Sequence, residues 1–376
     1  MNSSNKKKRI GITGQAGFMG THLFNYFGLQ KDLVRIPFDD SYFKEQSLLE
    51  QFVKQCEVIV HLAAMNRHGD PQVIYDTNIR LVRQLVEAMQ KTGSRPHVIM
   101  ASSTQEERGN HYGRSKKEGR EMLAKWAKEN ETIFTGLVIP NVYGPFGMPF
   151  YNSVISTFSY QLTHNERPHI ETDASLKLIY VNELVEIIYK TIIENINETE
   201  YLVKHSDEAN VSELLQILQA YQEIYLHSKT FPELRTNFQV NLFNTFRSYI
   251  ETDFFPVNLL KNSDARGTFV ETVKASCGGQ FSFSTTTAGV TRGNHFHIRK
   301  VERFTVIQGE AIICLCKIGT NDIIEYKLNG DQPGFVDMPV WYTHNITNIG
   351  NKDLYTLFWI NEFFDPNDPD TYFEKV

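Results

Sequence analysis

The length, composition and charge of the chain exclude several classes of protein. Its 376 residues suit roughly two to three domains, and its 41% apolar and 22% charged residues are ordinary for a globular protein. The formal net charge of -6 gives no basic field for nucleic acid, and no apolar run reaches the ~18 residues of a membrane span. Its four cysteines are too few and too scattered for a disulfide framework. We therefore expect a cytoplasmic protein that binds neither nucleic acid nor membrane.

Strands and helices alternate through the first part of the chain. Short apolar runs indicate buried strands, and longer runs with apolar residues three or four apart indicate helices. After the basic run Lys6–Arg9, which we expect to be a solvated tail, the expected strands are 10–13, 33–38, 58–63, 97–101 and 133–139. The expected helices are 23–27, 45–55, 75–91 and 112–129. This alternation predicts a parallel sheet that helices cover on both faces.

The pattern changes near Asp253. Residues 206–254 have helical spacing at 214–225 and 242–249, and we expect them to close the first domain. From Gly267 onward, β-rich runs alternate with turns at 267–274, 280–288, 303–307, 311–315, 323–328, 335–338 and 354–359. This predicts an all-β sandwich or barrel of about 120 residues. We place the first domain at 1–250 and the second at 255–376.

A glycine-rich loop, Thr13–Gly20, lies between the first expected strand and helix. Glycines let the backbone approach a pyrophosphate, and the helix N-terminus offers amide groups to it. A loop of this kind alone is often only a turn, but the strand before it and the helix after it favour dinucleotide binding. Asp39 and Asp40 follow the second strand, where a carboxylate favours NAD. A reductive biosynthetic role would favour NADPH, so both cofactors stay open.

Tyr112 and Lys116 are four residues apart in an expected helix and so lie on one face of it. A cation beside a phenol favours phenolate and lowers the pKa of the tyrosine. The tyrosine could then protonate a carbonyl oxygen as hydride arrives. A lone pair at this spacing usually belongs to a surface helix. The glycine loop, His61–Ala64 and Ser102–Thr104, found in the correct order, favour the catalytic interpretation.

Together these motifs resemble the extended short-chain dehydrogenase/reductase family, which has a Rossmann fold. The loop matches its glycine pattern, His61–Ala64 its HLAA segment beside the cofactor, and Ser102–Thr104 its Ser/Thr triplet. The resemblance implies catalysis by Thr104, Tyr112 and Lys116, with the lysine also holding the nicotinamide ribose. The cofactor-binding residues that it implies are Gly14, Gly17, Phe18, Met19, Gly20, Asp39, Leu62, Ala63, Ala64, Tyr112 and Lys116.

Four possible metal ligands lie in the β-rich part. His295, His297 and Glu302 have the spacing of the first cupin motif, and His344 lies in a segment that resembles the second, with Trp341 where glycine is usual. Buried histidines are mostly structural, but all four at this spacing favour a metal site. Imidazole and carboxylate ligands suit zinc, manganese, iron or nickel, so residue types alone do not fix the metal.

The resemblance extends over the chain from Ile10 to its last residues. Gly293–His297 and Tyr342–Asn345 resemble sugar-nucleotide cupins, and 359–367 and 370–373 continue the match. The chain is similar to the CapF family of bifunctional capsular-polysaccharide enzymes of the UDP-N-acetyl-L-fucosamine pathway, in which a reductase domain of the short-chain dehydrogenase/reductase type is fused to a zinc-binding cupin. We expect the same two-part architecture here.

The family resemblance implies two reactions on one substrate. The cupin would epimerise C3 of a UDP-2-acetamido-2,6-dideoxy-4-hexulose. The reductase would then reduce the C4 ketone with NAD(P)H, giving a UDP-2-acetamido-2,6-dideoxy-L-talose-type product. Both steps need the ketone, because it acidifies the neighbouring C3–H. The expected partner is a UDP-linked 4-keto-6-deoxy N-acetyl sugar, the expected assembly is a homodimer, and Tyr342 and Tyr372 are candidates for the C3 base.

Two other functions stay open. The first is a single-function reductase whose cupin is structural or dimerising, with an incidental metal. The second is a regulator without enzymatic activity that senses dinucleotide, which the Thr104, Tyr112 and Lys116 set disfavours.

Overall fold

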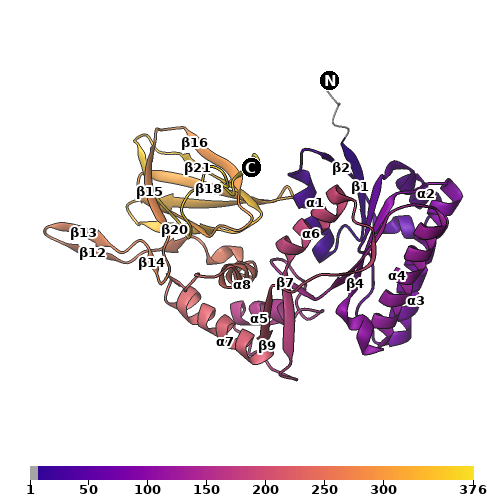
Figure 1. Ribbon diagram of the computed structural model, residues 1–376. Coiled ribbons are helices and arrows are strands. Elements are labelled where there is room, and N and C mark those ends of the chain that lie inside the picture. The colour runs from indigo at the N-terminus through magenta and orange to yellow at the C-terminus, as the bar shows by residue number, and fades with distance from the viewer. Residues whose placement is uncertain (1–6) are drawn as a thin grey trace. The chain divides into compact units, whose positions relative to one another are not determined.

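The computed structural model describes residues 7–376, which form two compact units (Figure 1). The first unit contains the described residues up to Tyr143, together with the later segments Phe150–Ser153 and Ala174–Ala209. The second unit contains Gly144–Pro149, Val154–Asp173 and Asn210–Val376. The helices after residue 210 therefore belong to the β-rich unit, whereas the sequence indicated a division near residue 250. The functional division into 1–250 and 255–376 remains a prediction.

The first unit is built on a six-stranded sheet in the order β2-β1-β3-β4-β5-β8. Its strands are β1 (Lys8–Thr13), β2 (Leu33–Ile36), β3 (Val58–His61), β4 (His97–Ser103), β5 (Phe134–Ile139) and β8 (Glu198–Leu202). All neighbouring strands are parallel, which confirms the expected sheet. A smaller sheet contains β6 (Asn141–Tyr143), β7 (Ser175–Tyr180) and β9 (Asp207–Asn210).

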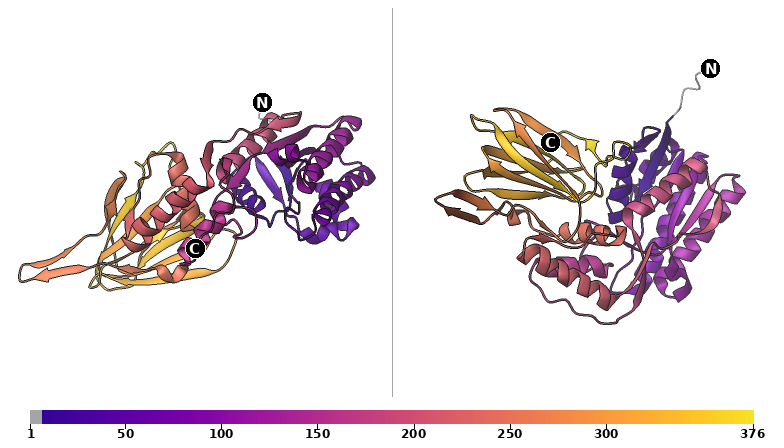
Figure 2. Two further views of the ribbon diagram at one scale, coloured as in Figure 1. Left: turned by 90° about the horizontal axis from the view of Figure 1, so that it is seen from below. Right: turned by 60° about the vertical axis from the view of Figure 1, so that its left-hand side comes forward.

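Helices cover both faces of this sheet (Figures 1 and 2). They are α1 (Phe18–Gly28), α2 (Gln46–Gln55), α3 (Pro71–Thr92), α4 (His111–Glu129) and α6 (Val181–Glu194). The core beneath α1 and α6 includes Ile12 and Val60, and the core beneath α2, α3 and α4 includes Ile59. Successive strand residues thus point to opposite faces, as the pleat requires. Within residues 7–376, no helix combines the length and apolar character needed to cross a membrane.

The basic run at the start of the chain is not a solvated tail throughout. Lys8 and Arg9 are the first residues of β1, and Lys8 Nζ donates a hydrogen bond to Ile192 O in α6 at 2.9 Å. Lys6 lies outside the described residues. The strand begins earlier than its apolar residues suggested because lysine and arginine fit an exposed strand end.

The β-rich part of the second unit consists of two five-stranded sheets. One has the order β11-β20-β17-β22-β15 and the other β19-β18-β21-β16-β23. The strands are β11 (Val257–Asn258), β15 (Gln280–Thr286), β16 (Thr291–Phe296), β17 (Glu302–Gln308), β18 (Glu310–Lys317), β19 (Ile323–Asn329), β20 (Gly334–Met338), β21 (Tyr342–Asn348), β22 (Leu354–Ile360) and β23 (Tyr372–Phe373). A hairpin of β12 (Lys261–Asp264) and β13 (Gly267–Val270) projects from this part (Figure 1). The expected all-β region is confirmed.

Helices of the second unit pack directly on the β-strands. They are α5 (Val154–Thr163), α7 (Val211–Tyr221), a π-helical turn at Gln222–His227 and α8 (Asn237–Arg247). Tyr225 donates a hydrogen bond to Asp337 in β20 at 2.6 Å, and Arg303 of β17 pairs with the same carboxylate at 2.6 Å. Phe231 stacks on Trp359 with ring centroids 4.2 Å apart. These buried contacts explain why the helices group with the β-rich region.

Candidate functional site

The loop between β1 and α1 can be built only with glycine at several positions. Gly14 has a φ of +71°, and a Cβ there would lie 2.9 Å from the backbone of Ala63. A Cβ on Gly20 would lie 2.2 Å from Gly14 O. Gly17 closes the turn, because its N–H donates to Gly14 O at 3.1 Å. The loop therefore presents backbone groups at the start of α1.

A cavity of about 420 Å³ lies beside this loop in the first unit. Five residues expected to bind the cofactor line it: Gly14, Gly17, Leu62, Ala63 and Ala64. Phe18, Met19 and Gly20 form the first turn of α1 and are not among the lining residues. The cavity is also lined by residues that sequence reasoning missed, including Lys44, Arg80 and Tyr151. Nothing in their spacing marked them, because α3 and distant loops bring them together.

The two aspartates after β2 have different positions. Asp39 accepts a hydrogen bond from Ser41 N at 2.8 Å and caps a short 3-10 helix, Asp40–Phe43. Its hydrogen bonds from Ser41 hold the pKa of Asp39 below its ordinary value. Asp40, not Asp39, lines the cavity. Arg35 is held away against α1, where its guanidinium lies 4.2 Å from the Phe24 ring centroid.

Tyr112 and Lys116 both lie in α4, which Asn110 caps by accepting a hydrogen bond from Gly113 N at 2.7 Å. Burial lowers the pKa of Lys116 to about 8, and the charge of Glu106 opposes that fall. Burial, with a smaller contribution from Tyr151, raises the pKa of Tyr112 to about 12. The expected lowering of the tyrosine pKa is therefore wrong for this structure, because loss of hydration outweighs any stabilisation of phenolate.

The Ser/Thr triplet is placed where β4 ends. Ser103 accepts a hydrogen bond from Gln105 N at 3.2 Å, and Ser102 donates one to Glu106. Thr104 is exposed and makes no side-chain hydrogen bond to another described residue. Ser103 thus keeps its hydroxyl proton free to donate, and Thr104 keeps both its donor and its acceptor positions for a ligand.

A buried ion pair connects the triplet with α4, and sequence reasoning missed it. Glu106 follows the triplet and accepts hydrogen bonds from Arg120 at 2.9 and 2.7 Å. Arg120 also donates to Thr199 O in β8 at 2.8 Å. Burial alone would raise the pKa of Glu106, but the bonds from Arg120 and Ser102 bring it below the ordinary value. The four-residue interval from Lys116 to Arg120 was the available signal, since it puts both cations on one helical face.

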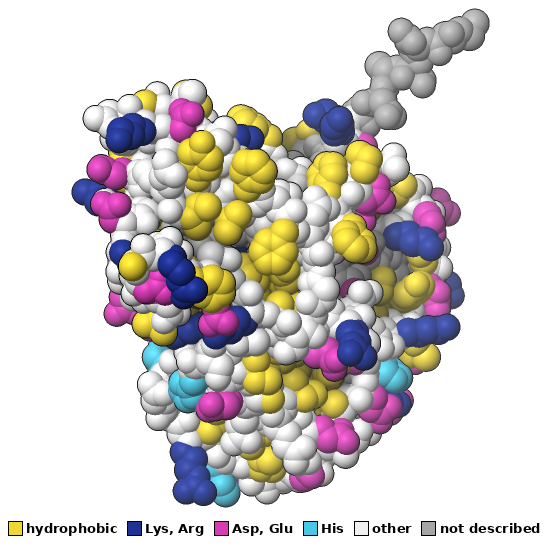
Figure 3. Space-filling view, turned by 90° about the vertical axis from the view of Figure 1, so that its left-hand side faces the viewer, with side chains coloured by type: hydrophobic (Ala, Val, Ile, Leu, Met, Phe, Trp, Pro, Cys, Tyr) yellow, Lys and Arg dark blue, Asp and Glu magenta, His cyan; other side chains and the backbone are white. Residues whose placement is uncertain are grey.

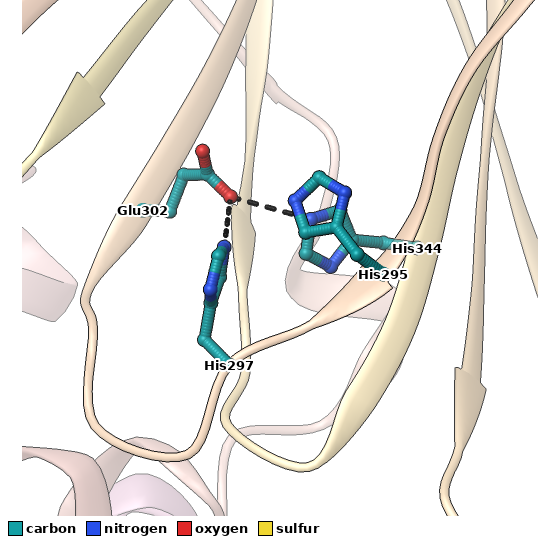
Figure 4. Close-up of side chains that lie close together, drawn as sticks. All are labelled: His295, His297, Glu302 and His344. Carbon is teal, nitrogen blue, oxygen red and sulfur yellow. Dashed lines mark hydrogen bonds and ion pairs between the residues drawn. The ribbon is translucent and has the colours of Figure 1, made fainter. Parts of the chain in front are cut away.

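The four expected metal ligands lie together in the second unit (Figure 4). Their possible ligand atoms all lie within 4.8 Å of one another. His295 belongs to β16, His297 follows that strand, Glu302 begins β17, and His344 lies in β21. His295 and His344 are cross-strand neighbours, with ring centroids 4.5 Å apart. Three of the side chains are buried and His295 is half-buried.

The hydrogen bonds of these histidines test whether the site fits a cation. His297 Nδ1 bonds Asp370 O and His344 Nδ1 bonds Tyr342 O. A carbonyl only accepts, so both Nδ1 atoms carry protons and a neutral ring keeps its lone pair on Nε2. Both Nε2 atoms face Glu302 Oε2, at 3.0 and 3.2 Å, and His344 Nε2 lacks hydrogen-bond geometry. Acceptors facing one another need a proton or a cation between them, so the residues fit a metal ion.

The pKa values depend on the same contacts. Burial lowers the pKa of His295 to about 4, so this ring is neutral near pH 7. Burial opposes protonation of His297, but its hydrogen bond to Glu302 raises the pKa above its ordinary value. Burial alone would raise the pKa of Glu302, and its contacts with His297 and His344 lower it. The carboxylate is therefore ionised, which suits a cation ligand.

Two features around the metal-ligand cluster explain details of the sequence. Trp341, in the place where the cupin motif has glycine, adopts a φ of +62° and stacks on Phe296 at 5.7 Å. The backbone thus keeps the glycine-type conformation despite a large side chain. Tyr372 also stacks on Phe296, at 5.4 Å, and burial raises the pKa of Tyr342. Neither the stacking of Tyr372 nor the raised pKa of Tyr342 identifies the base that would take the C3 proton.

Comparison with known proteins agrees with this architecture. The model of the NAD dependent epimerase/dehydratase family matches residues 10–203, and that of the Polysaccharide biosynthesis C-terminal domain matches residues 262–372. The chain is 31% identical over 368 residues to a Pseudomonas aeruginosa protein named UDP-2-acetamido-2,6-beta-L-arabino-hexul-4-ose reductase, covering 97% of this chain and 98% of that one.

Solved structures of CapF are similar over the whole chain. The capsular polysaccharide assembling protein CapF from Staphylococcus aureus has a TM-score of 0.63 and 33% identity, covering 98% of this chain and 100% of that one. A structure of CapF with the inhibitor 3-isopropenyl-tropolone has a TM-score of 0.59 and 31% identity at the same coverage. The chain belongs to the NAD dependent epimerase/dehydratase family, and the resemblance to CapF is confirmed over its full length.

Proposed function

We propose that the chain is a sugar-nucleotide enzyme that reduces the C4 ketone of a UDP-2-acetamido-2,6-dideoxy-4-hexulose with NAD(P)H, after epimerising C3. The observation that carries this proposal is the presence, in one chain, of a glycine-cradled cavity and a four-ligand cluster. Tyr112 and Lys116 of α4 are not among the lining residues, but Tyr112 interacts electrostatically with Tyr151, which lines the cavity. The name of the Pseudomonas relative supports the reductase and its substrate class.

The reductase chemistry follows from the residues of the first unit. The cofactor fits because the glycine loop leaves no room for side chains where a pyrophosphate would approach. The Tyr112 hydroxyl and the Lys116 ammonium make no hydrogen bond to other described residues, so both can bind substrate or cofactor. With a pKa of about 12, Tyr112 holds its proton near neutral pH and can donate it to the C4 oxygen. Thr104 can orient the same oxygen.

The epimerase chemistry is assigned to the second unit. His295, His297, Glu302 and His344 would hold a divalent metal, which we take to be zinc, although another divalent metal suits the same ligands. A bound metal would supply a Lewis acid for the charge that develops when C3 loses its proton. The backbone carbonyls of Asp370 and Tyr342 orient the rings of His297 and His344 by accepting hydrogen bonds from their Nδ1 atoms.

The rival is a reductase whose β-rich unit is only structural. Both functions are tested on a UDP-4-keto-6-deoxy N-acetyl-sugar in deuterated buffer, with the products followed by NMR. The proposal expects deuterium at C3 without cofactor, and the C4 alcohol of the epimerised sugar with NAD(P)H. Reduction without any C3 exchange would favour the rival, and no oxidation of NAD(P)H would contradict the reductase.

We also infer that the protein is a homodimer. β15 lies at the edge of its sheet and has one neighbouring strand. Phe281 and Phe283 point to the same face of this strand and are 57% and 71% exposed. Figure 3, which views the side carrying β15 and the β12–β13 hairpin, shows apolar side chains gathered there. Unprotected edges with exposed aromatic residues favour pairing with another chain. Light scattering that gives the monomer mass at micromolar concentration would contradict the inference.

A further inference from the structure

The last residues of the chain pair with β16, the strand that carries His295 and leads into His297. We call residues 368–376 the C-terminal strap. Its strand β23 pairs with β16, with Phe373 opposite His295. Glu374 N donates to Asn294 O at 3.1 Å, and Thr343, which precedes His344, donates through its hydroxyl to Glu374 O. The strap therefore contacts two of the ligand-bearing strands, β16 and β21, immediately beside His295 and His344.

Asp370 joins the strap to the turn between His297 and Glu302. Its carboxylate accepts hydrogen bonds from three consecutive backbone N–H groups, those of Ile298, Arg299 and Lys300, at 3.0, 3.1 and 2.9 Å. Its side chain is buried, at 1% exposure. Removing such a carboxylate would leave buried N–H groups without an acceptor, so the turn would have to rearrange.

The same residue also fixes the ring of His297. Asp370 O accepts the hydrogen bond from His297 Nδ1, which commits that nitrogen to carrying a proton and directs Nε2 to Glu302. Asp370 holds this geometry with a φ of +39°, in a region that non-glycine residues seldom adopt, although aspartate and asparagine adopt it more often than most. A strained backbone that brings both a carboxylate and a carbonyl to the metal-ligand turn indicates a positioning role.

We propose that Asp370 is a positioning residue of the metal centre, through which the C-terminal strap sets the affinity of the site for zinc. The inference rests on the proposed metal site and goes beyond it, because it assigns a role to a segment that supplies no ligand. A partner that orients a ligating histidine typically changes metal affinity by about 10–100-fold. By linkage, zinc must in turn hold the strap more firmly in place.

The test measures zinc affinity of the full-length protein by competition with a chromophoric chelator. Asp370→Asn replaces one of the two acceptor oxygens with an NH2 group that only donates, while tolerating the backbone conformation, and we expect zinc to bind about 10–100-fold more weakly. The matched control is Asp368→Asn in the same strap. Asp368 pairs with Arg299 at 2.9 Å on the exposed rim and contacts no ligand, so its affinity should match wild type.

A spectroscopic reading separates positioning from simple loss of stability. The visible bands of the cobalt-substituted protein report the geometry around the metal, so they should change in Asp370→Asn and stay unchanged in Asp368→Asn. Wild-type affinity and spectrum in a folded Asp370→Asn protein would overturn the inference. If wild type itself binds no zinc, the metal site fails instead, which is a different result.

A second measurement applies should Asp370→Asn not fold. Carboxypeptidase removes residues from the C-terminus of the wild-type protein, and zinc should slow that removal because the strap and the metal stabilise one another. Equal rates with and without zinc would overturn the inference without any variant. A metal ion that does not bind the cluster, such as magnesium, gives the control for nonspecific effects on the protease.

Discussion

At the scale of single residues, two neighbouring aspartates after β2 have different positions beside the cavity of the first unit. Asp39 caps the short 3-10 helix through Ser41, and Asp40 lines the cavity together with Lys44 and Arg80. The sequence named both aspartates and preferred Asp39, because the length of β2 could not be fixed within two residues from its apolar pattern. The structure ends β2 at Ile36 and places Asp40, rather than Asp39, in the lining of the cavity.

Asp40→Asn should shift cofactor selection towards NADPH. A carboxylate in the pocket disfavours a 2′-phosphate by like charge, while Lys44 and Arg80 would attract it once that charge is gone. We expect the ratio of kcat/KM for NADPH over NADH to rise about tenfold, equivalent to about 1.4 kcal/mol. Asp39→Asn is the matched control and should leave the ratio unchanged. An equal rise in both variants would mean that the pocket does not distinguish the two residues.

Glu106→Gln should shift the alkaline side of the reductase pH profile to lower pH. Lys116 has a pKa of about 8, and the negative charge of Glu106 raises that pKa against the effect of burial. Without the charge, Lys116 loses its proton at lower pH, so activity that needs the ammonium falls earlier as pH rises. Rates of NAD(P)H oxidation from neutral to alkaline pH measure the shift. Glu107→Gln, at the exposed neighbouring position, is the control, and an unchanged profile in Glu106→Gln would separate Glu106 from Lys116.

At the scale of elements, long periodic segments were predictable and the boundaries set by packing were not. The strands β1 to β5 and the helix α4 were expected close to their observed bounds, because alternation and helical spacing are local properties, whereas the edge strand β8 was not expected. The grouping of α7 and α8 with the β-strands was not predictable, since it depends on Asp337 meeting Tyr225 across 112 residues of chain. In the same way, the spacing of the histidines predicted their cluster. The contacts of Asp370 with the turn after His297 could not be predicted, because they depend on the pairing of β23 with β16.

Asp337→Asn should destabilise the second unit strongly. The side chains of Arg303 and Asp337 are 1% and 0% exposed, and Arg303 lies 3.4 Å from the centroid of the Phe335 ring. Removing one partner of a buried ion pair leaves the other charge without compensation, at a cost of about 3–5 kcal/mol. Urea unfolding followed by tryptophan fluorescence measures the loss. Asp264→Asn, in the exposed pair with Arg266, should change stability little. Similar small changes in both variants would show that the buried pair is not required.

At the scale of the whole molecule, the chain has two compact units, each with a hydrophobic core of its own and each with one candidate site. The sequence indicated both candidate sites from motifs near the two ends of the chain, because each set of motifs lies within a few neighbouring elements. What it did not indicate was that the second unit includes Val154–Asp173 as well as the β-rich part. Epimerisation and reduction should therefore be separable by mutation, provided that each site works from its own unit.

Two variants test that separation in both directions. His344→Ala removes one ligand of the metal-ligand cluster and leaves an incomplete coordination shell, so C3 deuterium exchange should fall at least about 10-fold. Tyr112→Phe removes the proton donor of the reductase, so NAD(P)H oxidation should fall by about 10²–10⁴-fold. Each variant should keep the activity of the other unit, with C4 reduction measured on sugar that is already epimerised. Chelation of wild type should reproduce the His344→Ala result. If exchange persists in metal-free protein, the proton transfer belongs to other residues. If either variant loses both activities while its unfolding curve is unchanged, the two reactions depend on one another more closely than two separate cores require.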